Sequence, residues 1–176
     1  MKPVHAGHWK LIVSAASECD EVLLYVSMSD RENVTHVMMS HIWEKYLLKR
    51  LPLNVKLIFC KNPVRAIFES IGEIDKSQQH DVTCVIYTDD ADALERYSDS
   101  VMQKYFKKLK SSGRVNVKSF NRDKFADYSS TAMRHALLLG DKVLFVAMLP
   151  ECIDDEQESE RLWNDISYKE HGSMGI

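Results

Sequence analysis

Two histidines near the start of the chain have the type and spacing of a phosphate-binding motif. His5 and His8 lie in the stretch KPVHAGH with Gly7 between them, and an amphipathic helix is predicted from Trp9 to Ser17. Both imidazoles can then face one anion, while the glycine lets a phosphate approach the backbone and the helix start adds N–H groups and a positive dipole end. The pattern predicts a triphosphate site, although ordinary loop histidines or a chance metal pair would give the same letters.

A second segment, SSTAMR, places hydroxyl and guanidinium groups at the start of another predicted helix. Ser129, Ser130 and Thr131 lie at its cap and first turn. Arg134 follows about one turn later, where its planar fork can reach the same anion as the helix-start N–H groups. The segment predicts a second contact to phosphate, and plain helix capping is the alternative interpretation.

Together the H-x-G-H and S-S-T-x-x-R motifs, on either side of a predicted parallel α/β unit, resemble the nucleotidylyltransferase superfamily with the HIGH-type motif. The resemblance runs from Lys2 to about Ser167. Within that superfamily, the sequence is most similar to the small cytidylyltransferase-like and adenylyltransferase-like proteins of large tailed phages and bacteria. The segments that carry this likeness are KPVHAGH, YVSMSDR, IWEKYL, SSTAMR and LWNDIS.

The resemblance implies transfer of a nucleoside monophosphate from CTP or ATP to a small phosphorylated or hydroxyl acceptor, with release of pyrophosphate and usually with Mg²⁺. It implies that His5, His8 and Arg134 act in catalysis, the histidines by binding the phosphates and stabilising transition-state charge. The implied nucleotide-binding residues are Lys2, Gly7, Arg31, Ser129, Ser130 and Thr131. No residue is assigned as a protein ligand of a metal, and the base and the acceptor stay open.

In-line displacement at phosphorus requires positioning and charge stabilisation from the protein, so it needs no Ser-His-Asp nucleophile. An alternative from a different class is a nucleotide-binding protein of the same fold without turnover, acting as a regulator or assembly partner. A class I aminoacyl-tRNA synthetase shares the first motif, but the chain is too short for tRNA-recognition domains and has no K-M-S-K-S signature.

Three further groups of polar residues have competing interpretations. Arg31 follows a predicted strand and is expected to bind the acceptor or the triphosphate. The sequence Thr88-Asp89-Asp90 could bind acceptor hydroxyls, but a turn and helix cap is favoured. The basic run from Lys104 to Arg114 is interpreted as a solvated helix face whose inward side chains are Tyr105, Phe106 and Leu109.

The elements that would position these residues alternate between strands and helices. Short apolar runs predict strands at 22–27, 55–60, 82–88 and 115–120. Capping residues and apolar periodicity predict helices at 37–50, 63–72, 98–112, 130–139, 142–149 and 161–167. This order predicts an α/β fold, a Rossmann-like doubly wound parallel sheet with helices on both faces, with ligands beyond the carboxyl ends of the strands.

One domain is expected over residues 1–168, followed by a flexible tail at 169–176. In the superfamily that the motifs resemble, the H-x-G-H loop follows a central strand, whereas here it begins directly after Met1-Lys2. Loss of that strand would leave neighbouring strands with unsatisfied backbone groups, at about 1–3 kcal/mol each. We therefore expect that residues of the native polypeptide precede Met1.

Composition narrows the class of protein. The 176 residues include 23 Lys and Arg against 26 Asp and Glu, a net charge of −3, which disfavours nucleic acid or an anionic membrane surface as the main partner. The absence of a long apolar run and of a signal peptide favours a cytoplasmic protein, in the host cytoplasm if it is phage-encoded. The four scattered cysteines are expected to be reduced. A homo-oligomer stays open.

Overall fold

The computed structural model describes residues 3–77, 81–120 and 128–171 of the chain. The strands are β1 (Val22–Ser27), β2 (Val55–Cys60), β3 (Cys84–Asp89) and β4 (Val115–Phe120). The helices are α1 (Ala6–Glu18), α2 (His36–Ile42), the π-helical turn η1 (Trp43–Leu47), the 3₁₀ turn η2 (Leu48–Arg50), α3 (Pro63–Lys76), α4 (Asp90–Glu95), α5 (Asp99–Tyr105), α6 (Lys107–Ser111), α7 (Ser130–Leu139), α8 (Lys142–Ala147) and α9 (Glu156–His171). The chain divides into two compact units. Unit 1 is made of two segments, Met1–Lys61 and Phe125–Ile176, and unit 2 is the segment between them, Asn62–Lys124.

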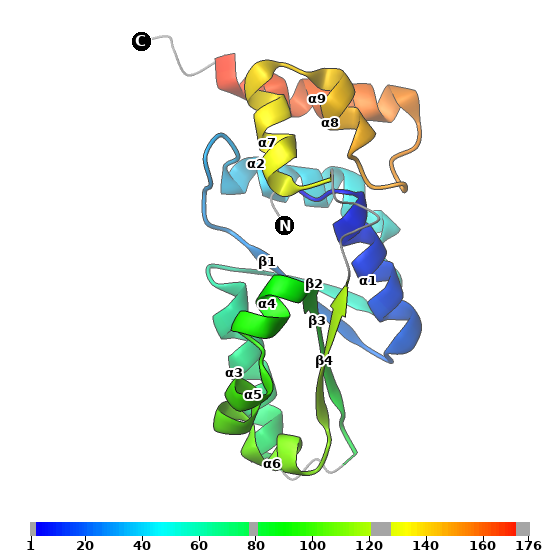
Figure 1. Ribbon diagram of the computed structural model, residues 1–176. Coiled ribbons are helices and arrows are strands. Elements are labelled where there is room, and N and C mark those ends of the chain that lie inside the picture. The colour runs from blue at the N-terminus through cyan, green and yellow to red at the C-terminus, as the bar shows by residue number, and fades with distance from the viewer. Residues whose placement is uncertain (1–2, 78–80, 121–127, 172–176) are drawn as a thin grey trace. The chain divides into compact units, whose positions relative to one another are not determined.

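Unit 1 contains β1 and β2 together with α1, α2, α7, α8 and α9 (Figure 1). The two strands pair in parallel, with a register that runs from Val22 opposite Val55 to Ser27 opposite Cys60. Two parallel strands need a long crossover, and α2 with η1 and η2 supplies it. Unit 1 is therefore an α/β unit whose strands come from the first part of the chain, while its last three helices come from the end.

The core of unit 1 is continuous across these two parts of the sequence. Trp9 of α1 and Trp43 of η1 are buried with residues of the last three helices, among them Met133, Phe145 and Leu162. Methionines fill much of this interior, and Met38, Met39, Met133 and Met148 are all at most 4% exposed. The unbranched thioether adapts to irregular gaps, which explains its use between helices of different direction.

Unit 2 has its own strand pair and its own core. β3 and β4 are parallel, with Cys84 opposite Val115 and Asp89 opposite Phe120. Helices α3 and α5 run along one side of this pair (Figure 1). Their apolar faces, together with α6, bury a separate cluster made of Ile71, Ile86, Tyr97, Met102, Phe106, Leu109 and Val115.

The predicted α/β class and the parallel pairing are confirmed, but the strands form two sheets of two strands within the described residues. A single doubly wound sheet is not what the structure shows. Each strand pair is covered by its own helices and by its own cluster of buried side chains, so the structure shows the α/β class and the parallel pairing within each unit. The four strand segments themselves agree with the sequence, apart from β3, which lies slightly later than predicted.

Several helix predictions need correction. Residues 37–50 are helical, but the α-helix gives way to a π turn at Trp43 and a 3₁₀ turn at Leu48. Gly72 does not stop α3, which continues to Lys76. The predicted helix at 98–112 breaks at Phe106, whose buried ring packs on that of Phe68 with 5.1 Å between centroids. Tyr105 points outward and is 55% exposed, contrary to the predicted inward face.

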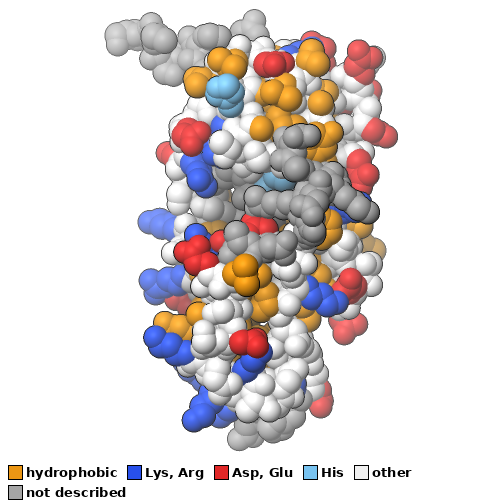
Figure 2. Space-filling model, viewed as in Figure 1, with side chains coloured by type: hydrophobic (Ala, Val, Ile, Leu, Met, Phe, Trp, Pro, Cys, Tyr) orange, Lys and Arg blue, Asp and Glu red, His pale blue; other side chains and the backbone are white. Residues whose placement is uncertain are grey.

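Helix α7 has a buried face and an exposed face, and both carry apolar side chains. Met133, Ala136 and Leu137 are buried, whereas Leu138 and Leu139 are about two-thirds exposed. Val143 and Leu144 of α8 are exposed as well. Apolar side chains gather over this part of unit 1 on the face drawn in Figure 2. No helix of the described residues is long and apolar enough to cross a membrane, and none of the four cysteines, all of which are described, forms a disulfide.

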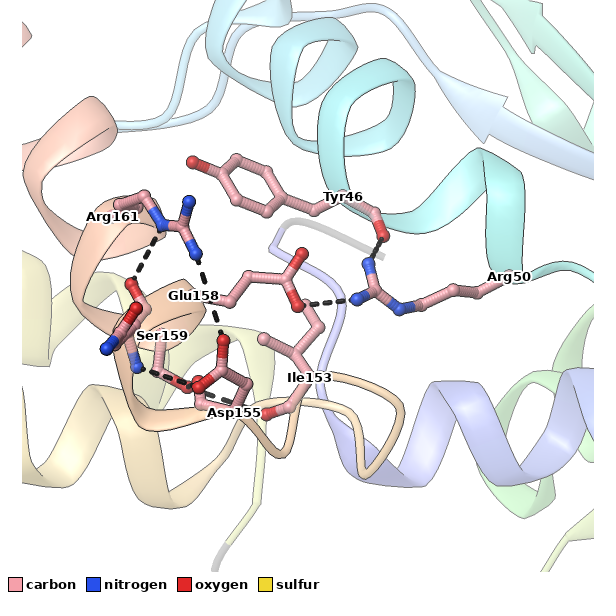
Figure 3. Close-up of polar contacts among 8 residues, drawn as sticks. Tyr46, Arg50, Ile153, Asp155, Glu158, Ser159 and Arg161 are labelled. Atoms are coloured by element: carbon pink, nitrogen blue, oxygen red, sulfur yellow. Dashed lines mark hydrogen bonds and ion pairs between the residues drawn. The ribbon is translucent and has the colours of Figure 1, made fainter.

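The last helix, α9, is longer than predicted and is fastened to the rest of unit 1 by charged contacts. It continues to His171, past residue 169, where the tail was expected to start. Arg50 donates both to the carbonyl oxygen of Tyr46 and to Glu158 of α9, each at 2.5 Å (Figure 3). At the start of α9, Ser159 donates to the backbone of Asp155, which holds the first turn.

Asp165 makes the second attachment of α9. One of its carboxylate oxygens accepts hydrogen bonds from His41, Lys45 and Tyr46 at 2.9, 2.6 and 2.5 Å. Burial alone would raise the pKa of this carboxyl, but the three hydrogen bonds outweigh that effect and hold the pKa well below its usual range. Lys45 and Tyr46 lie in the segment IWEKYL and Asp165 lies in LWNDIS, so these two segments contact each other.

We expect Asp165→Asn to lower the free energy of unfolding by about 1–3 kcal/mol near neutral pH. The lowered pKa means that the carboxylate stabilises the fold above its unfolded pKa and stops doing so as the pH falls through the folded pKa. The deficit of the variant should therefore shrink in acid. Urea unfolding from about pH 7 down to about pH 3 measures this, with the exposed Asp154→Asn as the control. A deficit that stays constant with pH contradicts the assignment.

Candidate functional site

The H-x-G-H motif forms the first turn of α1, so the helix begins at Ala6 and not at Trp9 as predicted. His5 is the N-cap residue, and its Nδ1 accepts a hydrogen bond from the amide of Gly7 at 3.2 Å. In return, Nδ1 of His8 accepts from the amide of His5 at 3.4 Å. The two rings lie 3.8 Å apart between centroids. The motif is therefore a reciprocal cap in which histidines take the roles usually played by Ser and Glu.

This cap fixes where each imidazole carries its proton. A ring nitrogen that accepts a hydrogen bond is deprotonated, so in this arrangement each ring is neutral and its proton is on Nε2. The Nε2–H group is a hydrogen-bond donor suited to a phosphate oxygen. By contrast, the amide of Gly7 donates to Nδ1 of His5, and the amide of Ala6 donates to the carbonyl oxygen of Met148 at 3.0 Å. At this helix start, these two amides therefore already have acceptors within the protein.

The S-S-T-x-x-R motif forms the start of α7, as predicted. Ser129 is the N-cap, and its hydroxyl accepts from the amide of Ala132 at 3.0 Å. Thr131 lies one residue into the helix and is exposed, with its hydroxyl oxygen accepting from Nη2 of Arg134 at 3.0 Å. The capping interpretation is thus confirmed for Ser129. A cap does not exclude anion binding, since the helix start keeps its positive dipole end.

The two motifs meet although 127 positions separate the residues that join them. The hydroxyl of Ser130 donates to the carbonyl oxygen of Pro3 at 3.0 Å, two residues before the first histidine. The hydrogen bond from Ala6 to Met148 lies close by in sequence and connects the start of α1 with the end of α8. Two helix starts that carry the predicted phosphate-binding residues are therefore held together within unit 1.

Arg134 is buried and paired inside the protein. Its side chain is 3% exposed, and Nε donates to a carboxylate oxygen of Glu32 at 2.7 Å. The hydrogen bond from Arg134 lowers the pKa of Glu32. Asn33, the next residue, donates from its side-chain amide to the backbone carbonyl of Arg134 at 3.0 Å. The sequence alone gave no indication of Glu32 and Asn33, because the stretch SDRENV reads as an ordinary polar loop.

Arg31 lies in the same tight turn as these two residues. Its backbone pairs with that of Val34 in both directions at 3.0 Å, and its side chain is exposed. The turn brings Arg31 to the segment that contacts Arg134. Asp89 caps α4 by accepting from the amide of Asp92 at 2.9 Å, which confirms the cap interpretation, and it belongs to unit 2. Lys2 lies outside the described residues.

The described side chains do not form a metal site of their own. They contain no group of three or more His, Cys, Asp or Glu residues arranged to hold an ion. The carboxylate of Glu32 is already engaged by the guanidinium of Arg134. Mg²⁺ prefers carboxylate, phosphate and water oxygens, so these donors do not fit a protein-held Mg²⁺. One surface hollow lies on α9, lined by Glu156, Gln157, Glu160 and Arg161, none of which belongs to the two motifs.

Comparison with known proteins gives no relative: no protein-family model, no curated protein and no solved structure matches the chain. The resemblance to the nucleotidylyltransferases thus depends on the residues of the two motifs. Any functional conclusion has to come from the chemistry of the α1 and α7 starts and from the contacts that join them.

Ser130→Ala removes a side-chain hydrogen bond that joins the two motifs directly. We expect the free energy of unfolding to fall by about 1 kcal/mol, because the carbonyl of Pro3 loses its donor. Ser17→Ala is the control, since the Ser17 hydroxyl only donates to a carbonyl within its own helix. Chemical denaturation measures both variants. Equal stability of Ser130→Ala and the unaltered protein would show that this contact does not hold the helix starts together.

Proposed function

We propose that the protein is a nucleotidylyltransferase that transfers a nucleoside monophosphate from CTP or ATP to a small phosphorylated or hydroxyl acceptor. The observation that carries the proposal is the hydrogen bond from Ser130 to Pro3, because it joins the start of α7 to the two-histidine start of α1. Each start offers donors to phosphate, and a triphosphate is long enough to use both. A Rossmann-like doubly wound sheet remains part of the proposal, supported by the parallel register of both strand pairs.

In the proposed reaction an acceptor oxygen attacks the α-phosphorus in line with the bond to the β-phosphate. The new P–O bond forms, the α–β bridge breaks, and pyrophosphate leaves with that electron pair. The Nε2–H groups of His5 and His8 would donate to the phosphate oxygens on which negative charge develops. Ser129, Ser130 and Thr131 would hold the β- and γ-phosphates at the α7 start, with Arg134 beside them. The lysine and glycine of the first motif, Lys2 and Gly7, complete the proposed site.

Mg²⁺ enters the proposal as a counter-ion that the triphosphate brings with it, where it would neutralise part of the phosphate charge. This follows from the donor set described above. The side chains of the two motifs are imidazoles, hydroxyls and a guanidinium, which donate hydrogen bonds to phosphate oxygens, and the nearby carboxylate of Glu32 is engaged by that guanidinium. The work of the protein is therefore positioning and donation of hydrogen bonds.

A specific contact favours a second candidate, a nucleotide-binding protein without turnover. Arg134, which the enzyme proposal places beside the phosphates, is already paired with Glu32 and buried. In that case the protein would bind nucleotide and act as a regulator or an assembly partner. It would bind nucleotide tightly without pyrophosphate release, and substitution of His5 would leave this binding unchanged.

The enzyme proposal predicts pyrophosphate release in a screen of four nucleoside triphosphates, with Mg²⁺, against phosphorylated acceptors. His8→Asn should lower the rate about 100-fold or more, the typical effect of removing one donor to a developing oxyanion. Asparagine can still accept the amide hydrogen bond of His5 through its oxygen, but it has no Nε2–H group. His135→Ala, an exposed histidine on α7, is the control.

Two results would count against this proposal. Turnover by His8→Asn at the unaltered rate would remove the histidine from the mechanism. Tight nucleotide binding without pyrophosphate release from any acceptor would favour the candidate without turnover. Thermal denaturation of each variant shows that the fold is intact before either result is interpreted.

A further inference from the structure

The pairing of Arg134 with Glu32 joins a buried cation to an exposed anion. The Arg134 side chain is 3% exposed and that of Glu32 is 60% exposed. Nε of the guanidinium donates to Glu32 at 2.7 Å, and Nη2 donates to Thr131 at 3.0 Å. Nε and Nη2 together form one edge of the guanidinium, the edge with which arginine binds carboxylates and phosphates in a forked arrangement. Two protein oxygens hold this edge in the structure.

The segment that delivers Glu32 has an uncommon backbone. Glu32 has a φ of +53°, the one positive φ at a non-glycine residue among those the structure describes. A residue other than glycine in this left-handed region costs free energy and persists only where its surroundings hold it. The backbone pairing of Arg31 with Val34 and the bond from Asn33 to the carbonyl of Arg134 supply that hold. The carboxylate is thus presented to Arg134 by a short strained turn.

We propose that Glu32 is an internal competitor for the phosphate-binding edge of Arg134, which a polyphosphate displaces when it binds. This inference rests on the proposed function, because the displacing anion is the triphosphate of the nucleotide. The carboxylate and a phosphate oxygen present the same kind of acceptor to the same N–H donors. In the absence of nucleotide, Glu32 pairs the buried guanidinium. With nucleotide bound, a phosphate oxygen takes that place.

The exposure of the two partners decides which of them leaves. Buried N–H donors without an acceptor are costly, so the Nε–Nη2 edge of Arg134 takes another acceptor when Glu32 leaves it. Glu32 can regain water when it is released, because its side chain is already mostly exposed, and its backbone can then leave the left-handed region. The exchange therefore favours an anion of higher charge density than a carboxylate, such as a triphosphate, and it resists weakly binding monovalent anions.

The opposite interpretation is that Glu32 positions Arg134 for the phosphate. The two interpretations predict opposite effects of the same substitution. If Glu32 competes, removal of its charge tightens polyphosphate binding. If Glu32 positions the guanidinium, removal of its charge weakens binding, because the side chain of Arg134 loses the contact that orients it.

The test is the affinity of Glu32→Gln for inorganic tripolyphosphate, and separately for CTP and ATP, by titration calorimetry. Competition predicts binding about five- to tenfold tighter than that of the unaltered protein. The matched control is Glu69→Gln, because Glu69 accepts from Nε of Arg65 at the same 2.7 Å and is also 60% exposed, but lies in unit 2. Both variants change the net charge equally, so only Glu32→Gln should change affinity.

A second variant and a second signal keep the test decisive. Glu32→Gly removes the carboxylate and accepts the left-handed backbone without strain, so it should also bind more tightly if the glutamine variant folds poorly. In the unaltered protein, the NMR signal of the Arg134 Nε–H group should move when tripolyphosphate is added. Weaker or equal binding by both variants, or a signal that does not move, overturns the competition.

The outcomes also separate this inference from the proposed function. Pyrophosphate release with unchanged affinity in Glu32→Gln would leave the enzyme proposal standing and reject only the competition. If none of the proteins binds tripolyphosphate or nucleotide, the proposed function fails and the competition fails with it. Tighter binding by Glu32→Gln without pyrophosphate release supports the competition and favours the nucleotide-binding protein without turnover.

Discussion

The hydrogen bond from the Ser130 hydroxyl to the carbonyl oxygen of Pro3 joins the two segments of unit 1 that carry its candidate site. The helix starts that carry the two motifs come from distant parts of the sequence, and this bond joins them, while the bond from Ala6 to Met148 joins the start of α1 to the end of α8. Burial reinforces the bonds, because Val4 and Trp9 share one core with Met133 and Met148. Each fully buried side chain of this size contributes about 1.5–3 kcal/mol. The core thus fixes which polar groups can face a common ligand.

Because Arg134 is buried, its positive charge has to be paired within the site. A guanidinium with 3% exposure needs an acceptor, and Glu32 and Thr131 provide one each. The same need makes the site selective, since an incoming anion must replace an existing partner. The histidines take part in the cap of α1. Their Nδ1 atoms serve the cap of α1, and this role leaves the proton on Nε2, the form in which imidazole donates to phosphate.

Local signals in the sequence predicted much of the fold. The β-branched and apolar runs at 22–27, 55–60 and 115–120 are strands with those bounds, and Ser129 and Gly140 delimit α7 because a hydroxyl cap and a left-handed glycine are local devices. Gly72 was misleading, because a glycine inside a helix is tolerated when packing continues the helix on both sides. The Arg134–Glu32 pair joins residues 102 positions apart, so no local pattern indicates it. Two separate cores likewise depend on long-range packing, which periodicity does not encode.

The central claim is that the starts of α1 and α7 bind one polyphosphate together. The most direct measurement is a titration of ¹⁵N-labelled protein with inorganic tripolyphosphate, followed by two-dimensional NMR. The account predicts that signals from Gly7 and His8 and signals from Ser130 and Thr131 shift together, with one shared dissociation constant. Shifts confined to one helix start, or two groups with different dissociation constants, would contradict a single site. Shifts at neither start would remove the basis for a nucleotide-dependent function.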